Sequence, residues 1–315
     1  MIAQIDEVAS RIRQNVQKVI VGKDAVINLT LVAVLCEGHV LLEDVPGTGK
    51  TTLAKALAAS LGCTFRRIQF TPDLLPSDVT GINYFNEKAQ EFEFRPGPVL
   101  SQVVLADEIN RATPRTQSAL LEAMQERQIT ADGETRPLPR PFLILATQNP
   151  IELEGTFPLP EAQLDRFLLR VNIGYPGEAE ENAILERFRS DDPLSTLTTV
   201  TTPAEINDLI RQVRDVKVEE SVQNYVVAVA RRTRQHDEIA LGASPRATLA
   251  LYRTAQAWAA IHGSTFVTPD HIKFIAPYVL THRIMISSQM RLRGRTAEEV
   301  VTDVIADVPV PVTQV

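Results

Sequence analysis

The chain has 315 residues, of which 44% are hydrophobic and 23% charged, and its formal net charge is −7. This length suggests about two domains, and the acidic balance argues against non-specific attraction to nucleic acid or to anionic membranes. No apolar run approaches the roughly 18 residues needed to cross a bilayer, and the amphipathic N-terminus is not a signal peptide. We therefore expect a cytoplasmic protein with no membrane segment.

The first half of the chain alternates helical patterns with short apolar runs. Helical periodicity covers residues 4–20 and 24–37, and an apolar strand at 39–43 leads directly into a glycine-containing loop. A helix rich in Ala, Leu and Lys follows at 51–61 and ends at Gly62. Apolar strands that alternate with helices predict a parallel sheet covered on both faces. Further strands are expected at 65–70, 103–105, 142–147 and 167–173, and a further helix at 115–127.

Two insertions interrupt this alternation. Residues 71–98 and residues 128–141 each contain two short strand-like runs around a polar turn, and Asp132-Gly133 is the turn of the second. We expect a β-hairpin in each insertion. Two structured hairpins in one core are more typical of working parts than of tolerated loops.

The pattern changes at residues 174–177, Gly-Tyr-Pro-Gly. Beyond this turn no strand-like run is found, and several helices are expected to begin with a capping hydroxyl followed by proline. We therefore expect an α/β domain at 1–174, with hairpin inserts near 78–96 and 128–141, and an all-α domain at 175–315. The helices are expected at 178–190, 203–214, 219–235, 245–262 and 269–283.

Cys36 and Cys63 stand in apolar contexts and lack CxxC spacing. A disulfide framework or a metal site normally shows spaced pairs of thiols. We therefore expect both cysteines to be reduced residues of the core.

The loop after the first strand, residues 44–51, reads DVPGTGKT. Gly47 and Gly49 allow backbone N–H groups to surround phosphates, and the following helix adds its positive N-terminal end. Lys50 would bridge the β- and γ-phosphates, and the Thr51 hydroxyl would bind Mg²⁺. Asp44 departs from the general loop pattern, which has glycine there. We expect its carboxylate to point away from the phosphates and the position to tolerate glycine.

Two adjacent acids follow the apolar run in residues 103–111, VVLADEINR. Acids at the end of a core strand are costly unless a metal, a water or a cation needs them. Asp107 would hold Mg²⁺ through water, and Glu108 would orient and deprotonate the attacking water. With the phosphate loop, these acids indicate hydrolysis of a nucleoside triphosphate.

Three further polar residues are less specific. Asn149 follows the strand at 142–147, where its amide could position the attacking water, but Asn before Pro is equally a common turn pair. Arg166 and Arg246 are candidate cations, although a single arginine is usually a solvated or paired surface residue.

Five motifs in this order, DVPGTGKT, LADEINR, ATQNP, LPEAQLDRFLLR and GASPRA, resemble an AAA+ ATPase of the MoxR family over nearly the whole chain. The resemblance implies a P-loop NTPase core with a parallel sheet and a C-terminal all-α lid. The two insertions are similar to the helix-two insert and the pre-sensor hairpin of the AAA+ branch that includes MoxR proteins, magnesium chelatase subunits and MCM helicases.

The resemblance also implies roles for individual residues. Asn149 would be sensor 1, Arg166 a finger that reaches a neighbour's nucleotide, and Arg246 sensor 2, acting in cis or in trans. The adenine would rest near Val21 and Gly22. The expected catalytic residues are Glu108, Asn149, Arg166 and Arg246; the residues expected to bind ATP are Val21, Gly22, Pro46, Gly47, Thr48, Gly49, Lys50, Thr51 and Thr52; those expected to bind Mg²⁺ are Thr51 and Asp107.

The resemblance further implies a homo-hexameric ring that remodels a protein partner, one with a von Willebrand factor A domain, during maturation or metal insertion. A chelatase-type motor subunit is an alternative that differs mainly by its partner. A nucleic-acid motor is disfavoured, because such hairpins should carry Lys or Arg to meet phosphates. Here the tips carry Asp132 and Glu134 against Arg136, and Glu87 and Glu91 against Lys88.

Overall fold

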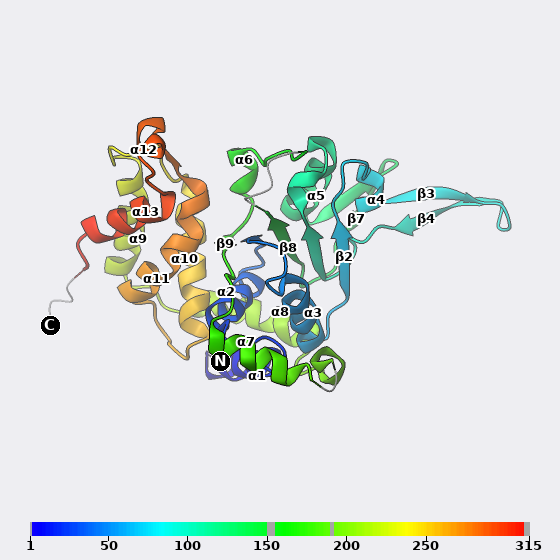
Figure 1. Ribbon diagram of the computed structural model, residues 1–315, viewed down its shortest axis with the longest axis horizontal. Coiled ribbons are helices and arrows are strands. Elements are labelled where there is room, and N and C mark those ends of the chain that lie inside the picture. Colours follow the sequence, from blue (N-terminus) through cyan, green and yellow to red (C-terminus); the bar gives the residue numbers. More distant parts are fainter. Residues whose placement is uncertain (1, 150–154, 190–191, 312–315) are drawn as a thin grey trace.

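Five parallel strands form the centre of the first half of the chain (Figure 1). The computed structural model describes residues 2–149, 155–189 and 192–311. Every strand pairing in the five-stranded sheet is parallel, and the spatial order is β2-β5-β8-β1-β9. The strands are β1 (Val40–Glu43), β2 (Phe65–Gln69), β5 (Val103–Asp107), β8 (Leu143–Gln148) and β9 (Leu169–Val171).

Successive residues of the central strands are buried on opposite faces of the sheet. Leu105 of β5 and Leu145 of β8 belong to one hydrophobic cluster, whereas Val104 and Ile144 belong to another. A strand buried on both faces must be apolar at consecutive positions, which is why these runs do not alternate with polar residues. The prediction of a parallel sheet covered on both faces is confirmed.

Helices cover both faces of the sheet. α3 ends at Gly62, whose left-handed φ of 63° lets its N–H return to the carbonyls of the last turn. The helices of this half are α1 (Ile2–Gln17), α2 (Asp24–Leu35), α3 (Lys50–Leu61), α4 (Pro76–Thr80), α5 (Pro114–Glu126) and α6 (Glu161–Leu164), and one 3-10 turn follows β5 at Ile109–Arg111.

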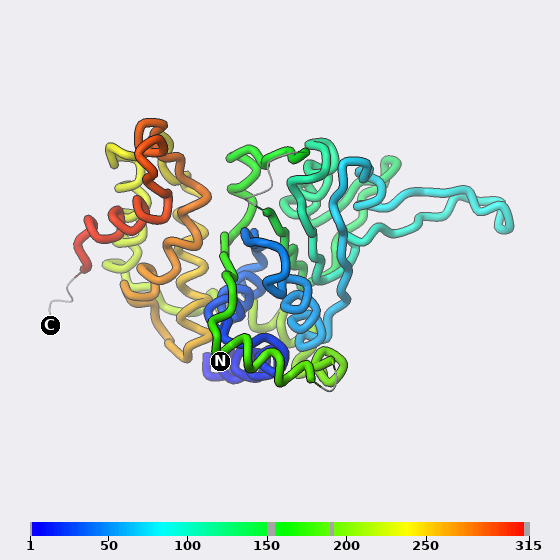
Figure 2. The backbone as a smooth tube through the Cα atoms, in the orientation of Figure 1, coloured from blue at the N-terminus to red at the C-terminus, as the bar shows by residue number. Residues whose placement is uncertain are grey.

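Both predicted hairpins are present. β3 (Gly81–Asn86) pairs with β4 (Glu91–Pro96), and β6 (Gln128–Ala131) pairs with β7 (Glu134–Pro137), in both cases antiparallel. The β3–β4 hairpin projects away from the rest of the molecule (Figure 2). Phe85 and Phe92 stand opposite each other near its tip and are 46% and 74% exposed.

The second half is helical, with one exception. The prediction that no strand follows residue 177 is wrong, because β10 (Ile239–Leu241) and β11 (Met285–Ile286) form a two-stranded antiparallel ribbon. Runs of two and three residues are too short to show an alternating pattern, and their pairing joins segments that are distant in sequence. The helices are α7 (Glu178–Arg187), α8 (Pro203–Gln212), α9 (Glu220–Thr233), α10 (Pro245–Ala260), α11 (Pro269–Leu280), α12 (Ser288–Leu292) and α13 (Ala297–Asp307), with 3-10 turns at Pro193–Thr196, Val213–Asp215 and Thr281–Arg283.

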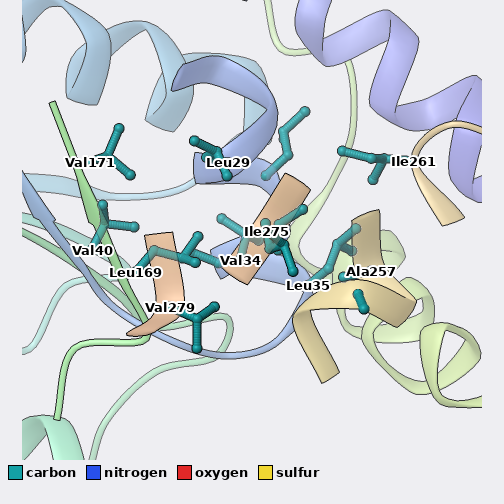
Figure 3. Close-up of a cluster of buried hydrophobic side chains, with 14 of the residues drawn as sticks. Leu29, Val34, Leu35, Val40, Leu169, Val171, Ala257, Ile261, Ile275 and Val279 are labelled. Atoms are coloured by element: carbon teal, nitrogen blue, oxygen red, sulfur yellow. The ribbon is translucent and has the colours of Figure 1, made fainter. Parts of the chain in front are cut away.

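The hydrophobic core is continuous between the sheet and the helical half. Figure 3 shows side chains of α2, β1 and β9 packed against side chains of α10 and α11. In Figure 1, α9 to α13 form a separate helical body, whereas α7 and α8 lie below the sheet near α1. The predicted domain boundary at residue 175 therefore stays a prediction. No helix among the described residues is long and apolar enough to cross a membrane.

A buried histidine, His39, lies directly before β1 and joins three parts of the core. Its Nδ1 accepts a hydrogen bond from the Ile144 N–H at 3.1 Å, so Nε2 carries the proton and donates to the Met124 carbonyl at 3.2 Å. Burial lowers the pKa of His39 to about 4 from its ordinary value of 6.5. A second proton on Nδ1 would face the Ile144 N–H. The folded protein therefore requires a neutral imidazole at this position.

His39 should make the protein sensitive to acid. Between pH 6.5 and about 4 the unfolded state binds more protons at this residue than the folded state, so the free energy of unfolding should decrease as the pH falls through this window. We expect the denaturation midpoint to fall less between about pH 7.5 and about pH 5 in His39→Gln than in the unchanged protein. The exposed His262→Gln is the control. An equal acid-induced loss in His39→Gln and the unchanged protein would contradict the assignment.

Candidate functional site

The phosphate loop, residues 44–51, connects β1 to α3 and turns at its two glycines. The φ angles of Gly47 and Gly49 are 87° and 86°, in the left-handed region. A Cβ on either glycine would meet no atom within 4 Å, so the backbone angle and not lack of space requires glycine here. The first N–H groups of α3 have no acceptor within their own helix, so this end of α3 suits an anion.

The phosphate loop lines a pocket of about 410 Å³ at the carboxyl edge of the sheet. This edge is where ligands bind in open α/β sheets. The structure brings most of the predicted site residues together in this pocket: Pro46, Gly47, Gly49, Lys50, Thr51, Thr52, Asp107, Glu108 and Asn149. Pro150, which follows Asn149, lies outside the described residues.

Lys50 is folded back onto the start of its own loop. Its Nζ donates hydrogen bonds to the Asp44 carbonyl at 3.1 Å and to the Val45 carbonyl at 2.6 Å. Burial lowers the pKa of Lys50, and the carboxylates of Asp44, Asp107 and Glu108 act in the opposite direction. These acids favour the charged ammonium that phosphate binding needs.

Thr147 of β8 holds the two acids at the end of β5. Its hydroxyl donates to Asp107 Oδ1 at 2.6 Å and accepts from the Glu108 N–H at 2.8 Å. Glu108 has a left-handed φ of 56°, which is uncommon for a residue with a side chain. Asp107 is the last residue of β5, and the backbone changes direction at Glu108. The two adjacent acids therefore differ in backbone conformation.

Strand β2 contributes two pocket residues that the sequence did not single out. Arg67 donates to Asp107 Oδ2 from Nε at 3.0 Å and from Nη2 at 2.6 Å, and Gln69 Nε2 donates to Glu108 Oε2 at 2.7 Å. Arg111 also lies beside Glu108, with Nε 3.2 Å from Oε2. The sequence could have indicated both residues of β2 through their spacing. Arg67 and Gln69 flank the buried Ile68, so their side chains lie on one face of the strand.

Arg166 and Arg246 lie in a different pocket. It has a volume of about 330 Å³ and shares no lining residue with the phosphate-loop pocket. Arg127, Arg253 and Arg283 line it as well, so it is strongly basic. The structure therefore brings Arg166 and Arg246 together but places neither beside the phosphate loop of the same chain.

A partly buried ion pair organises this second pocket. Asp165 accepts a hydrogen bond from Arg283 Nε at 2.7 Å, and Arg246 Nη1 lies 3.9 Å from the same carboxylate. Across the described parts of the chain, the Arg166 side chain makes no ion pair, with Glu161 or with any other acid. Its charge is thus available to a ligand or to another subunit.

Val21, Gly22 and Thr48 line neither of these two pockets. Gly22 has a φ of 67°, and a Cβ there would lie 1.7 Å from Glu180 Oε1 at the start of α7. The Thr48 hydroxyl donates to the Val45 carbonyl at 3.4 Å. The adenine-binding role of Val21 and Gly22 stays a prediction.

Comparison with known proteins shows the family of both halves of the chain. Residues 39–169 match the ATPase family associated with various cellular activities (AAA), and residues 231–304 match the AAA lid domain. A Bacillus subtilis protein called YeaC is 50% identical over 95% of this chain and 93% of its own. Chaperone MoxR1 of Mycobacterium tuberculosis is 41% identical over 94% of this chain and 80% of its own.

A solved structure has the same fold as this chain. The crystal structure of a candidate ATPase from Cytophaga hutchinsonii has 35% sequence identity and a TM-score of 0.93 to this chain. The match covers 99% of this chain and 97% of that one. The match thus extends over both the sheet and the helical half.

Replacement of Lys50 should impair ATP binding, whereas replacement of Glu108 should impair hydrolysis. Lys50→Ala removes the cation that is predicted to meet the phosphates, so we expect ATP affinity to fall at least about 100-fold. Glu108→Gln keeps the shape of the side chain but cannot accept a proton, so it should bind ATP normally while kcat falls by about 10²–10⁴-fold. Calorimetric ATP titration and phosphate release measure the two effects. Turnover by Glu108→Gln at the rate of the unchanged protein would exclude Glu108 as the base.

Proposed function

The chain belongs to the MoxR family of AAA+ ATPases, and we propose that it hydrolyses ATP as a homo-hexameric ring and uses the reaction to remodel a protein partner. The observation that carries this proposal is the separation of the predicted site residues into two pockets. The phosphate loop and the acids line one pocket, whereas Arg166 and Arg246 line the other.

A neighbouring subunit can supply the missing cations. Phosphoryl transfer needs positive charge near the γ-phosphate, where negative charge develops in the transition state. If the second pocket of one subunit faces the first pocket of the next, Arg166 and Arg246 both act in trans. Such a head-to-tail contact repeats between identical subunits and closes into a ring when the rotation between them allows.

Within the first pocket the roles follow from the contacts. Thr51 and Asp107 would hold Mg²⁺, since both offer oxygen atoms in the same pocket and Mg²⁺ takes oxygen ligands. The ion would neutralise charge on the phosphate oxygens. Glu108, held by Gln69 and Arg111, would take the proton of the attacking water, and Asn149 would orient that water.

The protein partner, or client, is proposed from the family. Family membership supports a chaperone-like role, and by resemblance we propose a partner with a von Willebrand factor A domain and a task in maturation or metal insertion. A chelatase-type motor would use the same two pockets and differ by its partner. We do not propose a nucleic-acid motor. The β3–β4 hairpin shows no excess of basic residues, since Lys88 and Arg95 stand against Glu87, Glu91 and Glu93. Arg136 of the other hairpin lies over the Phe94 ring, 4.0 Å from its centroid.

Arg166 should act on the ATP of a neighbouring subunit. Fingers of this kind contribute on the order of 10³-fold to hydrolysis, so Arg166→Ala should be nearly inactive although its own phosphate loop is intact. Lys50→Ala should also be inactive but keeps Arg166. When the two variants are mixed, subunits with an intact loop can receive Arg166 from Lys50→Ala neighbours, and ATPase activity should partly return. A mixture that co-assembles and stays inactive would rule out a finger in trans.

The client should be held most strongly in the ATP state. Glu108→Gln is expected to bind ATP without hydrolysing it and therefore to keep partner complexes assembled. We expect affinity capture with Glu108→Gln and ATP to retain a protein with a von Willebrand factor A domain. Lys50→Ala under the same conditions is the matched control and should not retain it. Capture of no such protein, or equal capture by both variants, would count against the proposed partner.

A further inference from the structure

Asp44 stands where the general phosphate loop has glycine, and the structure shows what it does there. Its φ is not in the left-handed region, so the backbone does not require glycine at this position. Asp44 is buried, with only 6% of the residue exposed. A buried carboxylate needs hydrogen-bond partners, and the partners of the Asp44 carboxylate among the described residues are backbone N–H groups.

The carboxylate joins the phosphate loop to the segment that follows β9. Oδ1 accepts from the Val45 N–H at 2.8 Å, while Oδ2 accepts from the N–H groups of Ile173 at 3.1 Å and Gly174 at 2.7 Å. The carboxylate thus accepts hydrogen bonds from both the phosphate loop and the segment after β9. The expectation that glycine is tolerated is not supported, because glycine would leave these three N–H groups without their acceptor.

The segment that Asp44 holds, residues 173–177, is here called the strap. It has no helix or strand of its own and leads from β9 into α7. The strap also contacts the loop at residues 21–23, near which the adenine is predicted to rest, because the Tyr175 carbonyl accepts a hydrogen bond from Lys23 Nζ at 3.0 Å. Lys23 Nζ lies 3.8 Å from Glu180 Oε2 of α7 as well. Since the strap lacks regular hydrogen bonding, contacts of this kind set its position.

Asp44 thus forms hydrogen bonds with both the phosphate loop and the strap. Its carbonyl accepts from Lys50, the residue that would move toward a bound phosphate, and its carboxylate accepts from the strap. β1 and β9 are neighbours in the sheet, so the phosphate loop and the strap leave the same edge side by side. A movement of the phosphate loop would therefore be transmitted to the strap through the hydrogen bonds of Asp44.

We propose that Asp44 is a positioning residue that ties the phosphate loop to the strap, so that nucleotide binding orders the strap and, through it, the Val21–Lys23 loop. The inference rests on nucleotide binding in the phosphate loop. Asp44, which stands where the general loop has glycine, would thus couple the phosphate end of the site to its predicted adenine end.

Hydrogen exchange of the strap amides, with and without saturating Mg²⁺-ADP, tests the proposal. In the unchanged protein we expect ADP to slow exchange at Ile173 and Gly174 at least about tenfold, because opening of the strap becomes linked to release of the nucleotide. Asp44→Asn keeps a single acceptor oxygen, so its amide N–H₂ must face either the Val45 N–H or the strap N–H groups. The tie is then broken on one side, and the slowing should be lost even when calorimetry shows that ADP is saturating. Asp44→Gly should behave in the same way and serves if Asp44→Asn does not fold.

The matched control is Glu43→Gln. Glu43 is the preceding residue at the end of β1, and its carboxylate pairs with Arg170 of β9 and not with the strap. Its ADP-dependent slowing should be retained. Equal slowing in Asp44→Asn and the unchanged protein, loss of slowing in Glu43→Gln, or no response in the unchanged protein with ADP bound would each overturn the coupling. A failure of the unchanged protein to bind ADP would instead overturn nucleotide binding in the loop, and the coupling with it.

Discussion

All five strands of the central sheet run in the same direction, and this constraint places every part of the phosphate-loop pocket. Parallel strands end at one edge, so the phosphate loop after β1, the acids after β5 and Asn149 after β8 meet there although they are far apart in sequence. Gln69 of β2 pairs in register with Asp107, and Glu43 of β1 pairs with Gln148 of β8. The strands thus end level with one another, and their terminal polar side chains can form hydrogen bonds across the sheet.

The pocket is a balanced set of charges. Asp107 and Glu108 are next to each other in sequence, yet they have separate cationic partners, Arg67 and Arg111, and Thr147 fixes the backbone turn between them. Lys50 is close enough to three carboxylates for each of them to favour its charged form. Side chains paired in this way keep defined positions in a pocket that is open to water, which suits chemistry that depends on positioning and charge neutralisation.

The helical half and the sheet share one hydrophobic core, through which subunits of the proposed ring could communicate. α10 and α11 share a hydrophobic core with α2, β1 and β9, so the helical body and the central strands meet through close-packed apolar contacts (Figure 3). Arg246 at the start of α10 and Arg166 after α6 line one pocket, in which Asp165 interacts with both Arg283 and Arg246. In the proposed ring, a change at this pocket would therefore affect helices that share a hydrophobic core with β1, the strand that leads into the phosphate loop.

The sequence by itself determined the class of the fold, both hairpins and the two motifs of the phosphate-loop pocket. These features depend on local patterns: consecutive apolar residues in buried strands, glycine where φ must be positive, and acids directly after a core strand. Family membership was also readable, since LADEINR and LPEAQLDRFLLR are contiguous motifs. The tertiary structure alone decided which distant residues meet. Arg67 and Gln69 join the acids because β2 is the neighbour of β5, Arg166 and Arg246 share a pocket remote from the phosphate loop, and the Asp44 carboxylate meets the strap because β9 lies beside β1. The physical reason is that strand order and helix packing are set by the burial of the whole chain, which no local run of residues records.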